Sequence, residues 1–584
     1  MRPSFRSILT HHSSWLRGPS GLLFTAWLSL APLGCSSGDE PQSSTLQGKL
    51  AVYEASYKDG SARVEYRLQR ADLSELKLKF ATPQSYAPGT AIEVHGSFTE
   101  QGEFVASSVE LAAQPAQVRT VTEAITQPTQ TRSIAVLLLR PSTEPEPPPW
   151  VISKPLVENS LFGTESLPDF PARAQNVNAY YQEVSYGARA LQGTVFDWLT
   201  IDPLPDYCDT TALRAAALAK ANESGIDLSS FQHVGMVVAA SCSSIAGYGE
   251  FGTPNAPGHY SWYYYEAGPE IFIHELGHNF AMQHSLLYQC TSASGDPVPL
   301  STTDHCSENP SYPQDPWDPM GYRSFAHFGA YNKLLQGWLA GTNVVTPPAS
   351  GGDFTLEPLE IGTSAPQALR IPADLSVCPA DIRPCYYYVE YRQPIGFDDS
   401  PQFANTGMHD GAVIRLGGEV DTTGNSLGNL TRFLLIDAPN ADALRVGETF
   451  QDPTGLQITP LSTPTSGDHH QLVVRVSRAS RISATFSFNS GQSGTTGSYC
   501  GEVVITNTST TPVDGGWLVR LNLGQSQLTS SWNANFSSLG SSRYDVTPVP
   551  WNSAIQPGQA ITAGLCADKT GANFTPQIEL TQSN

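Results

Sequence analysis

Short apolar stretches separated by turn residues recur along most of the chain, and their spacing predicts the local structure. Between 47 and 115, stretches such as 62–68 (ARVEYRL) and 91–96 (AIEVHG) place apolar residues at close, strand-like intervals. Such short stretches between turns are typical of β-strands with one buried face. The segment is therefore predicted to form a small β domain. A Thr- and Gln-rich linker follows at 116–133.

The next segment, 134–343, mixes two kinds of pattern. Residues 134–139 and 234–240 are almost wholly apolar, as expected of buried strands. Residues 211–220 (TALRAAALAK) are strong helix formers, and Gly225 is a plausible stop. We therefore expect a domain in which strands and helices alternate.

The remainder of the chain returns to strands and turns. Clear strands are expected at 385–391 and 472–476, within a β-sandwich at 350–478. A last block, 482–584, is rich in Ser, Thr, Asn and Gly and carries widely spaced tryptophans, which favours a second β-sandwich. The expected fold class is multidomain, with one α/β domain flanked by all-β domains.

Length and charge narrow the possibilities. A chain of 584 residues exceeds what one hydrophobic core supports, and 40% hydrophobic residues suffice for several cores. The formal net charge is −22. A chain this acidic repels phosphate backbones, so nucleic acid is excluded as its main partner.

The N-terminus indicates export. Three arginines, Arg2, Arg6 and Arg17, precede an apolar run at 21–33 that is too short to span a membrane, so 1–35 is predicted to be a signal peptide. The run ends in Pro-Leu-Gly-Cys35, which resembles a bacterial lipobox, and 36–46 is a polar tether. Lipidation of Cys35 is favoured over ordinary cleavage nearby. The expected location is the bacterial outer membrane or cell surface as a lipoprotein, or the medium after secretion, with membrane contact only through the lipid anchor.

Cysteine usage agrees with export. Without Cys35 an even number remains, which suggests four disulfides. Sequence order suggests pairing between neighbours, although the sequence does not prove the connectivity: Cys208 with Cys242, Cys290 with Cys306, Cys378 with Cys385, and Cys500 with Cys566.

The segment 274–284 (HELGHNFAMQH) carries the chemistry. On a helix, His274 and His278 lie four residues apart and face the same point. If the helix then ends and the chain turns, His284 can supply a third nitrogen. Three such ligands suit one catalytic Zn²⁺ whose fourth position is open to water, and Glu275 stands beside them to move a proton.

This segment resembles the zinc motif of the metzincin peptidases, and within them the gametolysin family. The family pattern continues with a Met-turn, and Asp-Pro-Met320-Gly-Tyr322 stands where that turn is expected. Residues 180–187 and 329–338 are also similar to this family, so the likeness covers about 134–343. The resemblance implies a zinc endopeptidase with Met320 beneath the metal. The family's glycine is replaced by Ala281, which either bears a strained backbone or changes the turn.

The resemblance also implies a mechanism. Zinc would activate a water, and Glu275 would act as general base and pass the proton to the leaving amine. Tyr322 would either bind zinc at rest or hydrogen-bond the oxyanion, with simple packing as the alternative. The strand-like residues 243–249 would pair with an extended substrate.

Latency through a thiol is excluded, because no cysteine lies between Cys35 and Cys208. The domain at 47–115, which we expect to be OB-like, is open to a role as a pro-domain or a chaperone domain.

The last block resembles the family 2 carbohydrate-binding modules of bacterial cellulases. The matching stretches are 503–507, 514–517, 531–533 and 550–552. By position, Trp532 and Trp551 match tryptophans that stack on sugar rings, and Trp517 matches a core residue. A third stacking tryptophan has no counterpart, since Thr495 stands near its place.

The hypothesis from the sequence is a monomeric, exported zinc endopeptidase that acts on protein or glycoprotein and binds polysaccharide through its last domain. The alternative is a surface adhesin that binds glycans and carries an inactive protease-like domain. Glu275 favours the enzyme, because degenerate sites commonly lose this acid.

Overall fold

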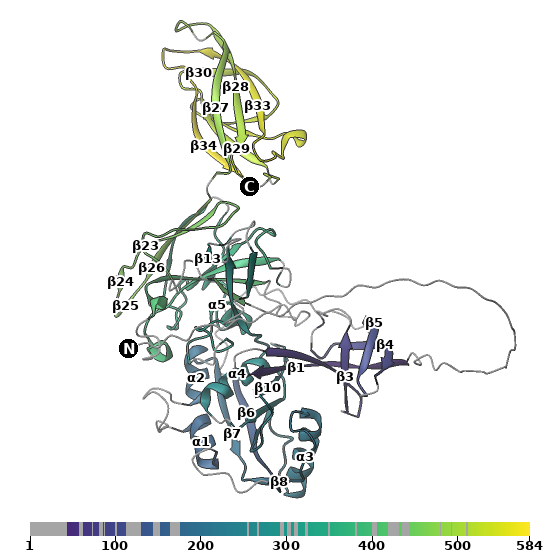
Figure 1. Cartoon of the computed structure of the whole chain (residues 1–584). Helices are drawn as coiled ribbons and strands as arrows, with labels where there is room; N and C mark the ends of the chain where they lie inside the picture. The colour runs from purple at the N-terminus through teal and green to yellow at the C-terminus, as the bar shows by residue number, and fades with distance from the viewer. Residues whose placement is uncertain are drawn as a thin grey trace, which may run out of the picture. The chain divides into compact units, whose positions relative to one another are not determined.

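Figure 1 shows the fold in a computed structural model of the whole chain. The structure describes the following residues: 44–57, 62–72, 74–80, 86, 88–99, 102–111, 130–143, 152–163, 176–253, 256–265, 268–291, 297–298, 300, 305–308, 314–321, 325–348, 351–379, 382, 384–399, 406–418, 431–434, 443–478, 480–491, 493–509, 512–514 and 516–583. The predicted signal peptide, Cys35 and most of the tether lie outside these residues.

The first part is a small closed barrel. Its strands are β1 (Ser44–Tyr57), β2 (Ala62–Gln69), β3 (Glu75–Phe80), β4 (Ala91–Phe98) and β5 (Phe104–Leu111). They follow the order β2-β3-β5-β4-β1, and β1 also pairs with β2, which closes the ring. The barrel core contains Leu50, Val52, Leu68 and Val94. The strand β1 is longer than its neighbours: its first half pairs with β4, and its second half pairs with β10 on that edge while it stays paired with β2 on the other.

The second part is a twisted sheet with helices on both faces (Figure 1). Its order is β10-β11-β9-β6-β7, with β8 beside β6. The strands β6, β7, β8, β9 and β11 run parallel where they pair, and β10 is antiparallel to β11. The bounds are β6 (Gln130–Pro141), β7 (Arg189–Val195), β8 (Leu199–Ile201), β9 (His233–Val238), β10 (Ile245–Glu250) and β11 (Tyr260–Tyr264).

The alternating side chains of β6 explain the two faces. Ile134, Val136 and Leu138 pack in one core with α1 (Lys154–Phe162), α2 (Val177–Val184) and α4 (Pro269–Asn279). Ala135, Leu137 and Leu139 pack in another core with α3 (Thr210–Glu223). Because both faces of the sheet are covered, the central stretches of β6 and β9, at 134–139 and 234–238, are apolar.

The third part is built from two packed sheets that share one core. One sheet has the order β13-β12-β20-β19-β18-β17-β15, with β14 and β21 at its sides, and the other has the order β16-β26-β23-β22. The bounds are β12 (Ser285–Thr291), β13 (Pro297–Val298), β14 (His305–Glu308), β15 (Val344–Val345), β16 (Gly352–Leu356), β17 (Ala368–Pro372), β18 (Cys385–Tyr391), β19 (Gly411–Gly418), β20 (Thr431–Leu434), β21 (Leu444–Arg445), β22 (Phe450–Gln451), β23 (Leu456–Ser462) and β26 (Leu472–Arg478). This part also contains helix α5 (Ala330–Leu335) and short 3-10 turns at Gly396–Asp398 and Gly407–His409. A hairpin is formed by β24 (Thr465–Ser466) and β25 (His469–His470).

This arrangement corrects the boundary expected between 134–343 and 350–478. Strand β12 lies before that boundary in the sequence, yet it pairs in parallel with β20, as β15 does with β17. The two segments therefore share a sheet. Pairing between strands so far apart in sequence leaves no local pattern, and composition alone placed the boundary.

The C-terminal part is a β-sandwich. One sheet has the order β27-β28-β33-β30 and the other β31-β32-β29-β34. The bounds are β27 (Ile482–Ser490), β28 (Ser498–Asn507), β29 (Trp517–Asn522), β30 (Ser526–Trp532), β31 (Asn535–Gly540), β32 (Arg543–Thr547), β33 (Ala560–Lys569) and β34 (Gln577–Ser583), with a 3-10 turn at Pro550–Asn552. Inward residues such as Val503, Val519 and Leu565 form its core.

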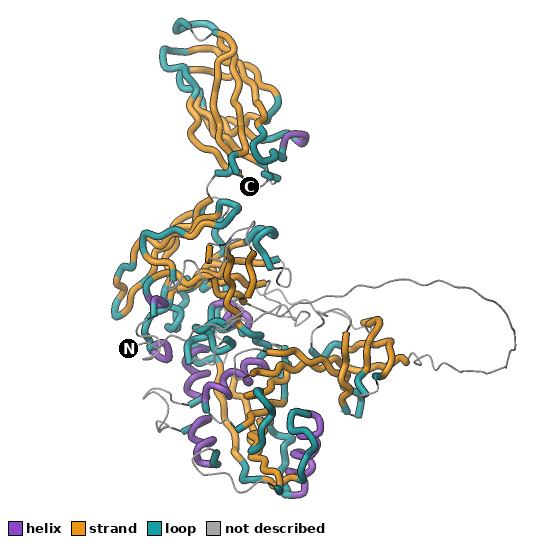
Figure 2. Tube along the Cα trace, in the orientation of Figure 1, coloured by secondary structure: helices purple, strands orange, loops and turns teal. Residues whose placement is uncertain are grey.

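Strands outnumber helices throughout the described residues, as Figure 2 shows, so the chain is multidomain and mostly β. Four disulfides join Cys208 to Cys242, Cys290 to Cys306, Cys378 to Cys385 and Cys500 to Cys566. The predicted pairing between neighbours is thus confirmed. Within the described part of the chain, none of the helices has the length and apolar character needed to cross a bilayer.

Candidate functional sites

Helix α4 carries the first two histidines and ends in a tight turn. Pro269 starts the helix, where its missing N–H costs nothing. The helix ends at Asn279 with Phe280 as its C-cap, and Ala281 follows with a left-handed backbone (φ +71°). The N–H of Met282 then donates to the carbonyl of Gly277 at 3.0 Å. Ala281 therefore bears the backbone strain that a glycine would avoid, and the turn is retained.

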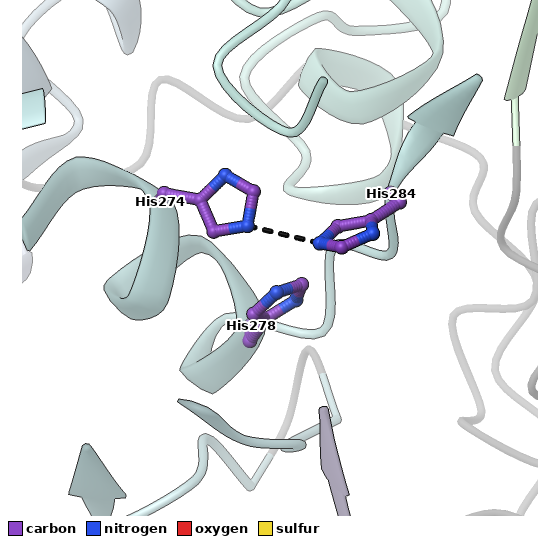
Figure 3. Close-up of side chains that lie close together, drawn as sticks. All are labelled: His274, His278 and His284. Carbon is purple, nitrogen blue, oxygen red and sulfur yellow. Dashed lines mark hydrogen bonds between the residues drawn. The ribbon is translucent and has the colours of Figure 1, made fainter. Parts of the chain in front are cut away.

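The turn brings His284 back to His274 and His278. Figure 3 shows the three rings facing one another, two from α4 and one from the segment after it. The ring centroids lie 4.9 to 5.0 Å apart, and Nε2 of His274 lies 2.9 Å from Nε2 of His284. All three side chains are buried, and one ring nitrogen from each lies within 4.8 Å of the others.

Carbonyl oxygens fix how these rings are protonated. Nδ1 of His274 lies 2.7 Å from the carbonyl of Pro319, and Nδ1 of His278 lies 2.9 Å from that of Met282. A carbonyl only accepts, so each Nδ1 carries the proton and each Nε2 carries a lone pair. Nε2 of His278 has no hydrogen-bond partner among the described residues. Buried lone pairs that converge on one point suit a cation.

Burial keeps the imidazoles neutral. It lowers the pKa of His278 to about 4. It also lowers the pKa of His284 well below its usual value, and the neighbouring His274 and His278 add to this effect. Neutral imidazoles are the form that binds metal. Three imidazoles, two of them oriented by carbonyls through Nδ1, can serve as ligands of a tetrahedral zinc ion with one open position.

Met320 lies directly under the helix. A Cβ added to Gly277 would come within 2.3 Å of the Met320 sulfur, so this glycine allows the close contact. Asp318 holds the turn, since its carboxylate accepts from the backbone N–H of Met320 at 2.9 Å and of Gly329 at 2.8 Å. Tyr322, two residues further on, lies outside the described residues.

Glu275 is fully buried between α4 and β10. A Cβ on Gly247 of β10 would lie 2.4 Å from its Oε1, so the carboxylate lies against the strand backbone. This places an acid beside the histidine cluster, on the side of β10.

Two side chains that the sequence analysis did not select also reach the cluster. Oε1 of Glu54 lies 3.4 Å from Nδ1 of His284, and its Oε2 lies 3.6 Å from Nδ1 of His278. The hydroxyl of Ser56 lies 3.2 Å from Nε2 of His274. Both belong to β1, more than two hundred residues away in sequence. No local motif marks them, and only the pairing of β1 with β10 brings them here.

The third part of the chain supports the cluster from outside. The hydroxyl of Ser285, next to His284, donates to Asp315 at 2.9 Å and lies 2.7 Å from the hydroxyl of Thr431 on β20. Arg415 of β19 donates to the same Asp315 carboxylate at 2.9 Å. The third histidine is therefore anchored through β12 to the neighbouring sheet.

A second candidate site lies on the C-terminal sandwich. The side chains of Trp532 and Trp551 are 38% and 70% exposed, whereas Trp517 is buried in the core. Trp532 lies opposite Gly564 in the ladder, and a Cβ on that glycine would lie 1.9 Å from the indole. The indole therefore rests closely on β33 with its outer side in solvent. An exposed indole offers an apolar surface on which a sugar ring can stack.

Asn552 connects the two tryptophans. It directly follows Trp551, and its amide donates to the carbonyl of Asn533, which directly follows Trp532, at 2.7 Å. Its own carbonyl accepts from the indole N–H of Trp517 at 2.8 Å. These bonds fix both exposed tryptophan segments to the core of the sandwich.

Comparisons with known proteins match this last part of the chain. Residues 482–583 match the profile of the cellulose binding domain family. The chain is 39% identical over 90 residues to endo-1,4-beta-xylanase A of Cellvibrio japonicus. The aligned region covers 15% of this chain and 14% of the xylanase. It is 37% identical over 91 residues to endoglucanase B of Cellulomonas fimi, covering 16% of this chain and 8% of that enzyme. The match thus spans less than a sixth of each relative.

Solved structures give similar matches. A cellulose-binding family 2 carbohydrate binding domain is 25% identical, with a TM-score of 0.16, over 18% of this chain and 100% of that domain. The chitin-binding domain of a chitinase from Pyrococcus furiosus is 20% identical, with a TM-score of 0.13, over 18% of this chain and 93% of that domain. From the sequence match, residues 482–583 are a cellulose-binding module of family 2, which binds carbohydrate.

Proposed function

We propose that the chain is an exported zinc-dependent endopeptidase that its C-terminal module directs to polysaccharide-bearing material. The observation that carries this proposal is the convergence of three buried imidazoles beside Glu275. Met320 packs under the same helix, as the metzincin resemblance implies. The four disulfides support export, since such bonds persist in oxidising compartments. Lipidation at Cys35 stays a prediction.

The residues present can divide the work of peptide hydrolysis. His274, His278 and His284 would hold zinc, which would supply Lewis acidity toward the scissile carbonyl. Glu275 would take a proton from the attacking water and deliver it to the leaving nitrogen. Its carboxylate lies against the backbone of β10, the strand that the sequence analysis assigns to substrate pairing. A role for Tyr322 stays a prediction.

The alternative proposal is a carbohydrate-binding adhesin with an inert protease-like domain. It is favoured by the comparisons, since the module at 482–583 binds carbohydrate whether or not the histidine cluster acts. The retained acid at Glu275 favours the enzyme, because a purely structural metal site has no need of a proton carrier.

Casein hydrolysis and zinc content, measured on the same preparations, separate the two proposals. The full chain is compared with Glu275→Gln and His278→Ala. Each protein is measured both intact and after it has been cut at a specific protease site inserted between 112 and 129. We expect one zinc per chain in wild type and in Glu275→Gln, and loss of zinc in His278→Ala. Hydrolysis should fall about 10²- to 10⁴-fold in Glu275→Gln, the usual contribution of a general base.

Glu270→Gln is the matched control, since Glu270 lies in the first turn of the same helix. It should retain both zinc and activity. Full activity in zinc-loaded Glu275→Gln would contradict the assigned base. A wild-type chain without zinc or hydrolysis, cut or uncut, would favour the adhesin.

A further inference from the structure

Strand β1 covers the open edge of β10. Figure 1 shows β1 running from the barrel to the α/β sheet, and Tyr53 to Tyr57 pair antiparallel with Glu250 to Ile245. The other edge of β10 is taken by β11. The sequence analysis expected 243–249 to pair with substrate, and in this structure a strand of the same chain holds that edge.

Alternation along β1 points two of its side chains at the histidines. Residues 54 and 56 share one face of the strand, and residues 53 and 55 share the other. Tyr53 and Ala55 pack in the core with α3. Glu54 and Ser56 therefore face α4, where they contact His284, His278 and His274 at the distances given above.

The environment of Glu54 calls for a positive charge. The side chain is buried, and its Oε2 has no hydrogen-bond partner among the described residues. An isolated buried carboxylate is strongly destabilising unless a cation or several hydrogen-bond donors offset its charge. The groups that face it closely are the imidazoles of His278 and His284. A cation held by these imidazoles would offset the charge and draw β1 onto the cluster.

Polar contacts hold the barrel against the same domain. The guanidinium of Arg67 donates to the hydroxyls of Thr210 and Thr211 at the start of α3, each at 2.6 Å. Arg214 of α3 donates to Glu75 of β3 at 3.0 Å. These partners are mostly buried, so the barrel and the α/β sheet form a specific interface.

We propose that strand β1 is an intrachain cover of the histidine site, seated there by Glu54 and Ser56. The intact chain is then a latent form, which opens when the barrel is displaced. This inference rests on the proposed function and names its regulation. In this proposal the carboxylate of Glu54, and not a thiol, holds the site closed. Strand β1 also occupies the edge of β10 that a peptide substrate would need.

The test uses the full chain, loaded with zinc, in three forms. Glu54→Lys places a cation against the cluster and should expel β1. A specific protease site inserted between 112 and 129 allows the folded wild-type chain to be cut, so that the barrel can leave. Glu93→Lys on β4 is the matched control, because Glu93 is partly exposed and lies outside the interface.

Three quantities are measured: hydrolysis of a quenched fluorescent peptide, the rate at which EDTA removes zinc, and amide hydrogen exchange within Ile245–Glu250. We expect Glu54→Lys and the cut chain to hydrolyse peptide and lose zinc at least tenfold faster than wild type. Exchange in β10 should also rise at least tenfold in both. Glu93→Lys should match wild type in all three.

Hydrogen exchange separates this proposal from the proposed function. Unchanged exchange in β10 in both opened forms would overturn the cover, whatever the enzymatic result. Measurable hydrolysis at the same rate by the intact wild type and the opened forms would also overturn it. Faster exchange in β10 without zinc binding or hydrolysis in any form would support the cover and contradict the peptidase.

Discussion

Backbone strain at a single residue connects the zinc helix to its third histidine. Ala281 has φ +71°, a conformation that costs a residue with a Cβ about 1–2 kcal/mol. The strain persists because the turn is held on both sides, by α4 before it and by β12 after it.

Replacing Ala281 with glycine should therefore stabilise this part of the chain. The gain from relieved strain is partly offset by the greater freedom of an unfolded glycine, which leaves about 0.5–1 kcal/mol. Urea unfolding of the zinc-free chain measures it. Ala215→Gly, in the exposed face of α3 with ordinary helical geometry, should instead lose about 1 kcal/mol. A loss of stability in Ala281→Gly would show that the alanine methyl contributes packing that outweighs the strain.

Among elements, the contact between β30 and β33 decides the orientation of one exposed tryptophan. Gly564 leaves room for the indole of Trp532 to lie on the strand. Gly564→Val should push the indole outward and tilt it, which removes its flat face from the ligand. We expect binding to cellulose to weaken about tenfold, equivalent to about 1.4 kcal/mol, as measured by depletion assays.

The control for this contact is Leu539→Val, which changes an exposed residue on β31 of the other sheet. It should leave binding unchanged. Undiminished binding by Gly564→Val would mean that the face of Trp532 is not used.

Helix α5 carries a buried lysine that makes stability depend on pH. Burial lowers the pKa of Lys333 to about 7, with Glu360 and Asp398 acting in the opposite direction. Its ammonium contacts Tyr186, His327 and the carbonyl of Leu359. Between pH 7 and the usual lysine value, the unfolded chain holds a proton that the folded chain lacks. The contribution of Lys333 to stability therefore rises with pH across this window.

The measurement is the unfolding midpoint of wild type and Lys333→Met from pH 7 to 9, below the range where tyrosines titrate. The slope with pH should be smaller in the variant. Equal slopes would mean that Lys333 keeps its proton in the folded chain.

In the whole molecule, the cellulose-binding module should change where the proposed peptidase acts without changing its chemistry. The double variant Trp532→Ala, Trp551→Ala should hydrolyse a soluble peptide at the wild-type rate. Hydrolysis of a protein attached to cellulose should fall about tenfold or more, because the local concentration gained by binding is lost. A parallel fall with the soluble peptide would show that the module acts on the site directly.

The sequence predicted features that depend on nearby residues, and it failed where distant segments meet. The spacing of His274 and His278 on one helix follows from residues close in sequence, and each disulfide joins cysteines that are neighbours in cysteine order. The carbohydrate-binding module has its own core and its own match. Glu54 and Ser56 were missed, because a strand's partner is set by tertiary packing that no periodicity records.

The anchoring of Ser285 to Thr431 limits how this chain can be recombined. The module at 482–583 has its own core, and the xylanase and the endoglucanase match this chain over 14% and 8% of their own lengths. The histidine cluster, in contrast, depends on contacts with the neighbouring sheet. His284 directly precedes β12, whose neighbour β20 lies beyond residue 430, so a transplant ending near 343 would leave β12 without that partner. A graft that keeps the cluster intact must extend to the end of β26, at Arg478.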